Sequence, residues 1–223
     1  GLLAFGHAGP QRKLACNTSS LVESEDCVIV SVGSENEWQF EHDVVAKTRC
    51  RVEVFDCTSA AARASPGGTV PGYARTIWSV PKHLSHRVRL HNKCLGTPQY
   101  RMLPKGFSIK AAQSLNWLEL LQFIGLNQTA PTLLKIDCEG CEVEVFRELM
   151  RHKMLHLLPS QIAVELHYPY DPTTAGSPPS RGTTWQLRFA DVHREWPVED
   201  MLQALHEQAG YTVATALPGT EVY

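Results

Sequence analysis

The chain alternates between short apolar runs and longer segments with helical spacing. Residues 27–32 (CVIVSV) form an apolar run that ends at Gly33, which predicts a strand buried on both faces. Apolar positions then recur at helical spacing over 37–48, and strand character returns over 51–55 before Asp56. This strand–helix–strand unit opens the ordered core that we expect.

The same alternation continues along the rest of the chain. The remaining predicted elements are, in chain order, a strand at 88–91, a helix at 115–124 capped by Ser114, a strand at 132–136, a helix at 142–156, a strand at 161–166, a helix at 198–209 and a strand at 211–216. Such an order predicts parallel strands joined by right-handed crossovers, and therefore a doubly wound, mostly parallel α/β sheet of Rossmann-like type.

The segments around this core carry weaker patterns. Residues 1–26 lack clear periodicity and are expected to be an entry segment with one short helix. Residues 171–184 are rich in Pro, Gly and Thr, which favours a flexible loop, either an active-site lid or a solvated linker. Only residues 221–223 follow the last predicted turn, so we expect the final strand to be incomplete.

Composition limits the classes of binding partner but does not decide the cellular compartment. The net charge is -2 with basic residues scattered, which argues against nucleic acid, and no apolar stretch is long enough to cross a bilayer. Seven cysteines fit either an oxidising compartment with one free thiol or reduced buried thiols, and there are two glycosylation sequons, at Asn17 and Asn127. Gly1 is not an initiator Met, so an upstream segment could have been removed. Cytoplasm and secretory pathway both stay open, as does the oligomeric state.

A cofactor is expected where the first strands end. Gly33 lets a ligand approach the backbone, with Ser34 and Glu35 in the same turn, and Asp56 follows at the distance of a ribose-binding acid. Asp137 ends the 132–136 strand at the same edge. The structural alternatives are a tight turn for the glycine and turn or capping roles for the two acids. Three spaced glycines are missing, which discourages a nucleotide-dependent oxidoreductase.

Candidate catalytic groups lie at the same edge. Glu139 follows Asp137, while Glu165 and His167 alternate on the next strand and so point the same way. They are candidates for positioning a substrate or acting as a base. A divalent cation held by Asp137, Glu165 and His167 is not favoured, because three separated ligands without a binding loop arise easily by coincidence. A strand-end ion pair is the structural alternative.

Cys138 and Cys141 form a C-x-x-C motif after a strand and before a helix. This motif is found in thiol oxidoreductases and in halves of zinc sites. No second C-x-x-C completes a zinc set, and the motif lies far from the opening unit of the fold. We therefore expect core packing, or disulfides to cysteines elsewhere.

Four segments in order resemble one family. LLKIDCEGCEVEVF (133–146) is similar to the signature of the FkbM-like and methyltransferase-like protein 24 group, and three further segments agree with it: VSVGSENEWQFE (30–41), VEVFD (52–56) and QIAVELH (161–167). The resemblance implies a class I methyltransferase domain over 27–223 with S-adenosylmethionine as cofactor. It matches Gly33 to the cofactor turn, Asp56 to the ribose-binding acid and Asp137 to the signature acid beside the methionine end.

The activity implied is methyl transfer to an oxygen or nitrogen of an acceptor. A sugar or other glycan, a small metabolite and a protein all remain open as that acceptor. One departure from the family is the single glycine in the first turn, where the family has a glycine-rich run. The alternatives are a catalytically silent binding module with the same fold and, less favoured, the oxidoreductase.

Overall fold

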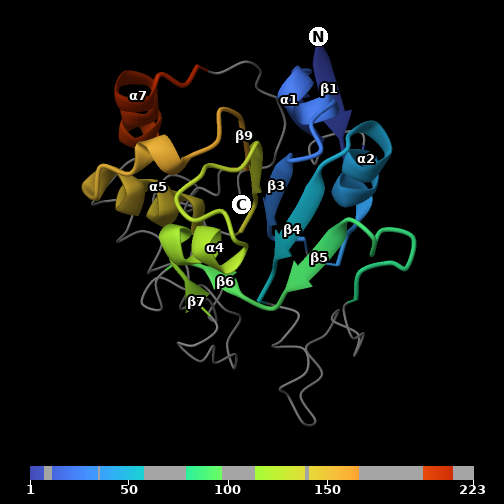
Figure 1. Ribbon diagram of the computed structural model, residues 1–223. Helices are drawn as coiled ribbons and strands as arrows, with labels where there is room; N and C mark the ends of the chain where they lie inside the picture. Colours follow the sequence, from blue (N-terminus) through green and yellow to red (C-terminus); the bar gives the residue numbers. More distant parts are fainter. Residues whose placement is uncertain are drawn as a thin grey trace, which may run out of the picture.

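The computed structural model describes residues 1–7, 12–34, 36–57, 79–96, 114–138, 141–165 and 198–212 (Figure 1). Its centre is a five-stranded parallel sheet in the order β5-β4-β3-β8-β9. The strands are β3 (Val28–Val32), β4 (Arg51–Phe55), β5 (Val88–His91), β8 (Leu133–Ile136) and β9 (Ile162–Val164). This sheet confirms the predicted Rossmann-like α/β fold.

The strand order reverses direction once. From β3 the chain moves outward through β4 to β5, and then returns to the other side of β3 as β8, followed by β9. Val32 pairs with Ile136, so Gly33 and Asp137 leave the sheet side by side. This switch point between β3 and β8 is where open α/β sheets bind ligands.

One face of the sheet is covered by helices from the second half of the chain (Figure 1). They are α4 (Trp117–Phe123), α5 (Cys141–Arg151), the 3-10 helix η3 (Leu155–Leu157) and α7 (Val198–Ala209). Trp117 is fully buried there and donates its indole N–H to the Leu157 carbonyl oxygen at 3.1 Å. Its aromatic surface joins α4 to the segment after α5, which fixes the layer on the sheet.

The opposite face is covered by α2 (Gln39–Lys47) and by the N-terminal segment (Figure 1). This segment contains α1 (Ser19–Val22), the one short helix expected there, and a β-hairpin, which the sequence pattern did not predict. The hairpin strands are β1 (Leu2–Phe5) and β2 (Lys13–Cys16), paired antiparallel. Phe5 is fully buried in the core beneath this hairpin, so the core reaches into the entry segment.

Several predicted boundaries differ from the structure. The cap of α4 is Asn116, whose side chain accepts from the Glu119 N–H while Glu119 bonds back, and not Ser114, which lies in the short strand β7 (Ser114–Leu115) beside β6 (Cys94–Leu95). Helix α5 ends at Arg151 instead of residue 156, because Lys153 adopts a positive φ of 55° that an α-helix cannot accommodate.

The end of the chain is described only in part. Residues 211–212 are not a strand, and the rest of the strand predicted at 211–216 lies outside the described residues, as do the 171–184 loop and residues 221–223. Among the helices that the structure describes, none combines the length and the apolar composition that a membrane crossing requires.

Six of the seven cysteines form disulfides: Cys27–Cys50, Cys57–Cys94 and Cys138–Cys141. Cys16 is free and exposed, as expected for an odd count in an oxidised protein. The expectation that Cys138 and Cys141 would pack as thiols or pair with cysteines elsewhere was wrong. The turn into α5 brings their Cα atoms to 5.4 Å, within the usual range for a disulfide, so they bond to each other.

Candidate functional site

Five of the eight predicted site residues lie together at the carboxyl edge of the sheet. Gly33 and Ser34 follow β3, and one acid follows each of β4, β8 and β9, namely Asp56, Asp137 and Glu165. The main-chain ladder continues to this edge, since the Asp137 N–H donates to Val32 and the Glu165 N–H to Ile136. The other three residues, Glu35, Glu139 and His167, lie outside the described residues.

Gly33 is required by packing at the switch point. Its φ is +76°, and a Cβ placed there would lie 1.6 Å from the carbonyl oxygen of Asp137. No side chain fits at that distance, and positive φ already disfavours other residues. From the sequence, we expect Gly33 to let a ligand approach the backbone. The structure adds a second reason for a glycine here, because the turn packs directly against the end of β8.

Asp56 ties the end of β4 to this turn. Its side chain is buried, and its Oδ2 accepts the Ser34 backbone N–H at 2.9 Å and the Ser34 hydroxyl at 3.4 Å. The turn role offered as the structural alternative for Asp56 is therefore present. It also holds the carboxyl group beside the glycine turn, where the ribose role would require it.

Two buried lysines neutralise the acids around the switch point. The ammonium of Lys13, from β2, lies 2.5 Å from Glu165 Oε2 and 3.5 Å from Asp137 Oδ2. Lys135, from β8, lies 3.6 Å from the same Asp137 oxygen and donates to the carbonyls of Val32 and Gly33. Both lysine side chains are only 8% exposed, so these contacts supply the partners that a buried ammonium requires.

Neither lysine was among the predicted site residues, for different reasons. Lys135 interrupts the otherwise apolar strand Leu133–Ile136, and a charge inside a buried strand was a usable signal. Lys13 comes from the N-terminal hairpin, 152 residues from Glu165 in sequence, and no local pattern indicates that pairing. The ion-pair alternative predicted for Glu165 is present, with Lys13 as its partner.

The sequence raised two possible metal sites, a divalent cation at Asp137 and Glu165 and a zinc ion at the C-x-x-C motif. Between Asp137 and Glu165 the positive charge is provided by the Lys13 ammonium, in the position that a shared divalent cation would take. At the C-x-x-C motif, the potential ligand atoms of Cys138, Cys141 and Glu142 lie within 4.8 Å of one another. The disulfide uses both sulfurs, and a disulfide lacks the thiolates that zinc binds.

Glu41 is a further buried acid beneath the glycine turn. It lies on α2 with 1% of its surface exposed, and its Oε1 accepts the hydroxyl of Ser31 on β3 at 2.7 Å. Its Oε2 has no hydrogen-bond partner among the described residues. Burial raises the pKa of Glu41, as does the negative charge of Asp56, while the Ser31 hydrogen bond and the Lys135 charge act in the opposite direction.

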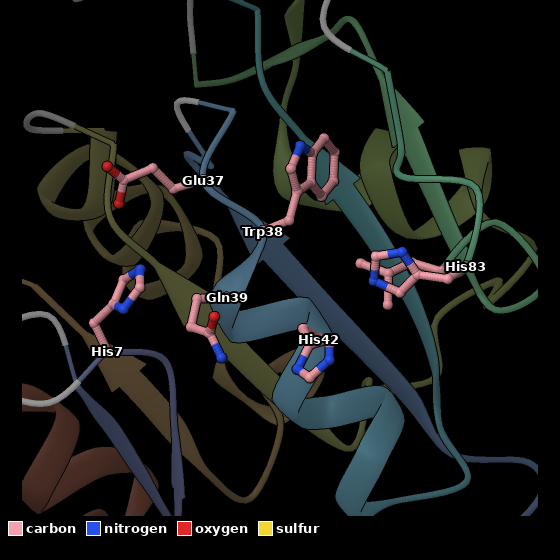
Figure 2. Close-up of a pocket in the computed structure, with 7 residues that line it drawn as sticks. His7, Glu37, Trp38, Gln39, His42 and His83 are labelled. Carbon is pink, nitrogen blue, oxygen red and sulfur yellow. The ribbon is translucent and has the colours of Figure 1, made fainter.

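A separate hollow of about 310 Å³ lies beside the start of α2 (Figure 2). Figure 2 shows its side chains projecting from the start of α2, from the end of the first hairpin strand and from the turn before β5. Three of the seven lining residues are histidines, and the ring centroids of His42 and His83 lie 5.8 Å apart in an edge-to-face arrangement. The residues are His7, Glu37, Trp38, Gln39, His42, His83 and Leu84, none of which is a predicted site residue.

Comparison with known proteins identifies the family. Residues 3–196 match the Methyltransf_22 family, described as a methyltransferase domain. The chain belongs to this methyltransferase domain family. The match begins at residue 3, so it includes the hairpin that carries Lys13. Neither the curated proteins nor the solved structures gave a match to the chain.

In this methyltransferase domain, the contact between Gly33 and Asp137 can be tested with a matched pair of glycines. Gly125 has a φ of +80°, close to that of Gly33, but a Cβ there meets nothing within 4 Å. We expect Gly125→Ala to lower the free energy of unfolding by about 1 kcal/mol through backbone strain alone. Gly33→Ala is expected to cost at least about 2 kcal/mol more from overpacking, as measured by urea denaturation. Equal losses would show that the contact is unimportant.

Glu41 predicts a pH dependence of stability. Because its pKa is raised in the folded state, the folded protein binds more protons than the unfolded chain above the ordinary value of 4.5. The contribution of Glu41 to stability is therefore greatest below that pH and is lost as the pH rises through the folded-state pKa. Glu41→Gln keeps an acceptor for Ser31 but cannot ionise, so we expect it to gain stability relative to the native protein as the pH increases.

The measurement is urea denaturation of both proteins at a series of pH values from 4.5 to 8. Glu37→Gln, a change at an exposed position of the same segment, controls for the loss of one negative charge. Parallel stability curves for the native protein and Glu41→Gln would contradict the assignment.

Proposed function

We propose that this domain transfers a methyl group from S-adenosylmethionine to an oxygen or nitrogen of an acceptor. The observation that carries the proposal is the grouping at the switch point, where the glycine turn, the buried Asp56 and the lysine-flanked Asp137 lie at the carboxyl edge. The motifs shared with the FkbM-like and methyltransferase-like protein 24 group favour the same cofactor, and they favour membership of that group.

The residues present suit such a donor. Asp56 places a carboxylate at the end of the second strand, next to the turn that begins with Gly33, which is where a ribose-binding acid is expected. The methionine part of the donor carries an ammonium and a carboxylate. Asp137 supplies a negative charge and Lys13 and Lys135 supply positive charges that can pair with them. When bound, S-adenosylmethionine supplies an electrophilic methyl group on a sulfonium.

The chain's part in the reaction is to orient the acceptor and to hold its proton. In-line transfer depends mainly on the placement of the two reacting groups. Glu165 lies next to the switch point, but Lys13 already contacts its Oε2 at 2.5 Å. We assign Glu165 to orienting the acceptor together with Lys13, and we keep Glu139 and His167 as the candidates for a base. Sugars, small metabolites and proteins remain the acceptor classes.

Calorimetric titration with S-adenosylhomocysteine tests the donor site. We expect the native domain to bind it, and Asp56→Asn to weaken binding roughly tenfold or more, since hydrogen bonds to a charged group contribute about 1.5–3 kcal/mol. Asn retains an oxygen that can accept the Ser34 N–H, so the glycine turn stays anchored. Asp43→Asn is the matched control, because Asp43 lies on α2 and its carboxylate pairs with Lys47 at 3.1 Å.

The same titration separates the alternatives. Absence of binding by the folded native domain would contradict the proposal and favour a catalytically silent module. Binding of NADH with no binding of S-adenosylhomocysteine would favour the oxidoreductase. An equal loss of affinity in Asp56→Asn and Asp43→Asn would show that Asp56 does not contact the ligand.

A further inference from the structure

The Cys138–Cys141 disulfide borders the switch point and has no part in the proposed reaction. Cys138 directly follows Asp137, and a Cβ on Gly33 would lie 3.5 Å from the Cys138 Cα. The disulfide therefore closes a four-residue ring that begins against the glycine turn. Any change in this ring acts on Asp137 and on the turn that packs against it.

This disulfide is the one best suited to open. Its cysteines are three residues apart, against 23 for Cys27–Cys50 and 37 for Cys57–Cys94, and the shortest loop contributes least to stability through chain entropy. Cys138 and Cys141 are both partly exposed. Cys27 and Cys50 are both buried in the core, and in the third pair Cys57 is partly exposed but Cys94 is only 6% exposed. Cys138–Cys141 is therefore the disulfide in which both cysteines are partly exposed to a thiol in solution.

The neighbouring Glu142 favours the reduced state. Its Oε2 lies 3.2 Å from Cys138 Sγ, and its side chain is fully buried. A disulfide sulfur carries no hydrogen, so in the oxidised protein this contact joins two acceptors without a hydrogen bond. After reduction the Cys138 thiol can donate to the carboxylate. Reduction thus creates a hydrogen bond that the oxidised form lacks.

The start of α5 favours release of the other sulfur. Helix α5 is 11 residues long and begins at Cys141. The exposed amide groups and the dipole of a helix N-terminus stabilise a thiolate in its first turn. Cys141 is therefore the better leaving group when a thiolate attacks the Cys138 sulfur.

We propose that Cys138–Cys141 is a redox-active disulfide that exchanges with dithiols and that its oxidised form is the state competent to bind the methyl donor. In the exchange, one thiolate of the dithiol bonds to Cys138 and Cys141 leaves as a thiolate. The second thiol of the reductant then attacks the mixed disulfide and releases Cys138. Two electrons pass to the protein, the reductant becomes a disulfide, and its two protons end on Cys138 and Cys141.

The coupling to donor binding, which rests on the proposed function, follows from preorganisation. The closed ring holds Cys138, and with it the Asp137 carbonyl that meets Gly33, in one arrangement. In the reduced protein, ligand binding must also order this segment, which lowers the affinity. Linkage is reciprocal, so a bound donor analogue makes the disulfide harder to reduce by the same factor.

The test uses the Cys16→Ser domain, which removes the exposed free thiol. The protein is titrated with dithiothreitol, trapped by alkylation and mapped by mass spectrometry, and each state is titrated with S-adenosylhomocysteine. We expect Cys138 and Cys141 to become reduced while Cys27–Cys50 remains intact, and the dissociation constant to rise roughly fivefold or more. The Cys138→Ser/Cys141→Ser variant should match the reduced protein and should not respond to reductant.

The outcomes separate the claims. Reduction of Cys27–Cys50 or Cys57–Cys94 first would overturn the exchange site, and reduction of Cys138–Cys141 with unchanged affinity would overturn the coupling. If no state binds S-adenosylhomocysteine, the proposed function fails, while the alkylation map still decides whether the disulfide exchanges. Should the double variant not fold, the reduced native pair gives the same comparison, with circular dichroism to confirm that it stays folded.

Discussion

The close approach of the Gly33 turn to the end of β8 is the constraint on which the site depends. A missing Cβ lets the backbone after β3 meet the Asp137 carbonyl at a distance that no other residue permits. This contact lies where the strand order reverses, so it sets the relation between the two halves of the sheet. Asp56 adds a second anchor to the same turn from β4.

Charge is organised around that constraint. Three acids follow β4, β8 and β9 at one edge of the sheet, and the buried ammonium groups of Lys13 and Lys135 offset two of them, Asp137 and Glu165. Unpaired, each lysine would be costly to bury, and the acids would repel one another. The N-terminal hairpin therefore helps to build the site, because it carries Lys13 to the ends of β8 and β9.

Covalent bonds reinforce the same edge. Asp56 and Asp137 are each followed directly by a cysteine in a disulfide, Cys57 and Cys138. The first bond fastens the end of β4 to β6, and the second closes the turn into α5. The third disulfide, Cys27–Cys50, joins the residues just before β3 and β4, at the amino ends of both strands. The bonds at the carboxyl edge differ from it in bordering the residues proposed to bind the donor.

The sequence predicted the parts of this structure that local patterns determine. Strands β3, β4 and β8 stand out because each is a short segment rich in apolar residues that stops at a glycine or an aspartate, and α7 has the predicted bounds. The Asn116–Glu119 capping box also has a local sequence signature, an Asn followed three residues later by a Glu, which the prediction of Ser114 as the cap overlooked. The Lys13 pairing was not readable, because its energy comes from contacts between segments far apart in sequence. Pairing of Cys138 with Cys141 depends on where α5 begins, which periodicity locates only to within a few residues.

The most direct measurement is a crystal structure of the oxidised domain with S-adenosylhomocysteine. We expect the ligand to lie across the ends of β3 and β8, with its ribose hydroxyls on Asp56 and its amino-acid end beside Asp137. Density for the ligand elsewhere, for example in the imidazole-lined hollow beside α2, would contradict it.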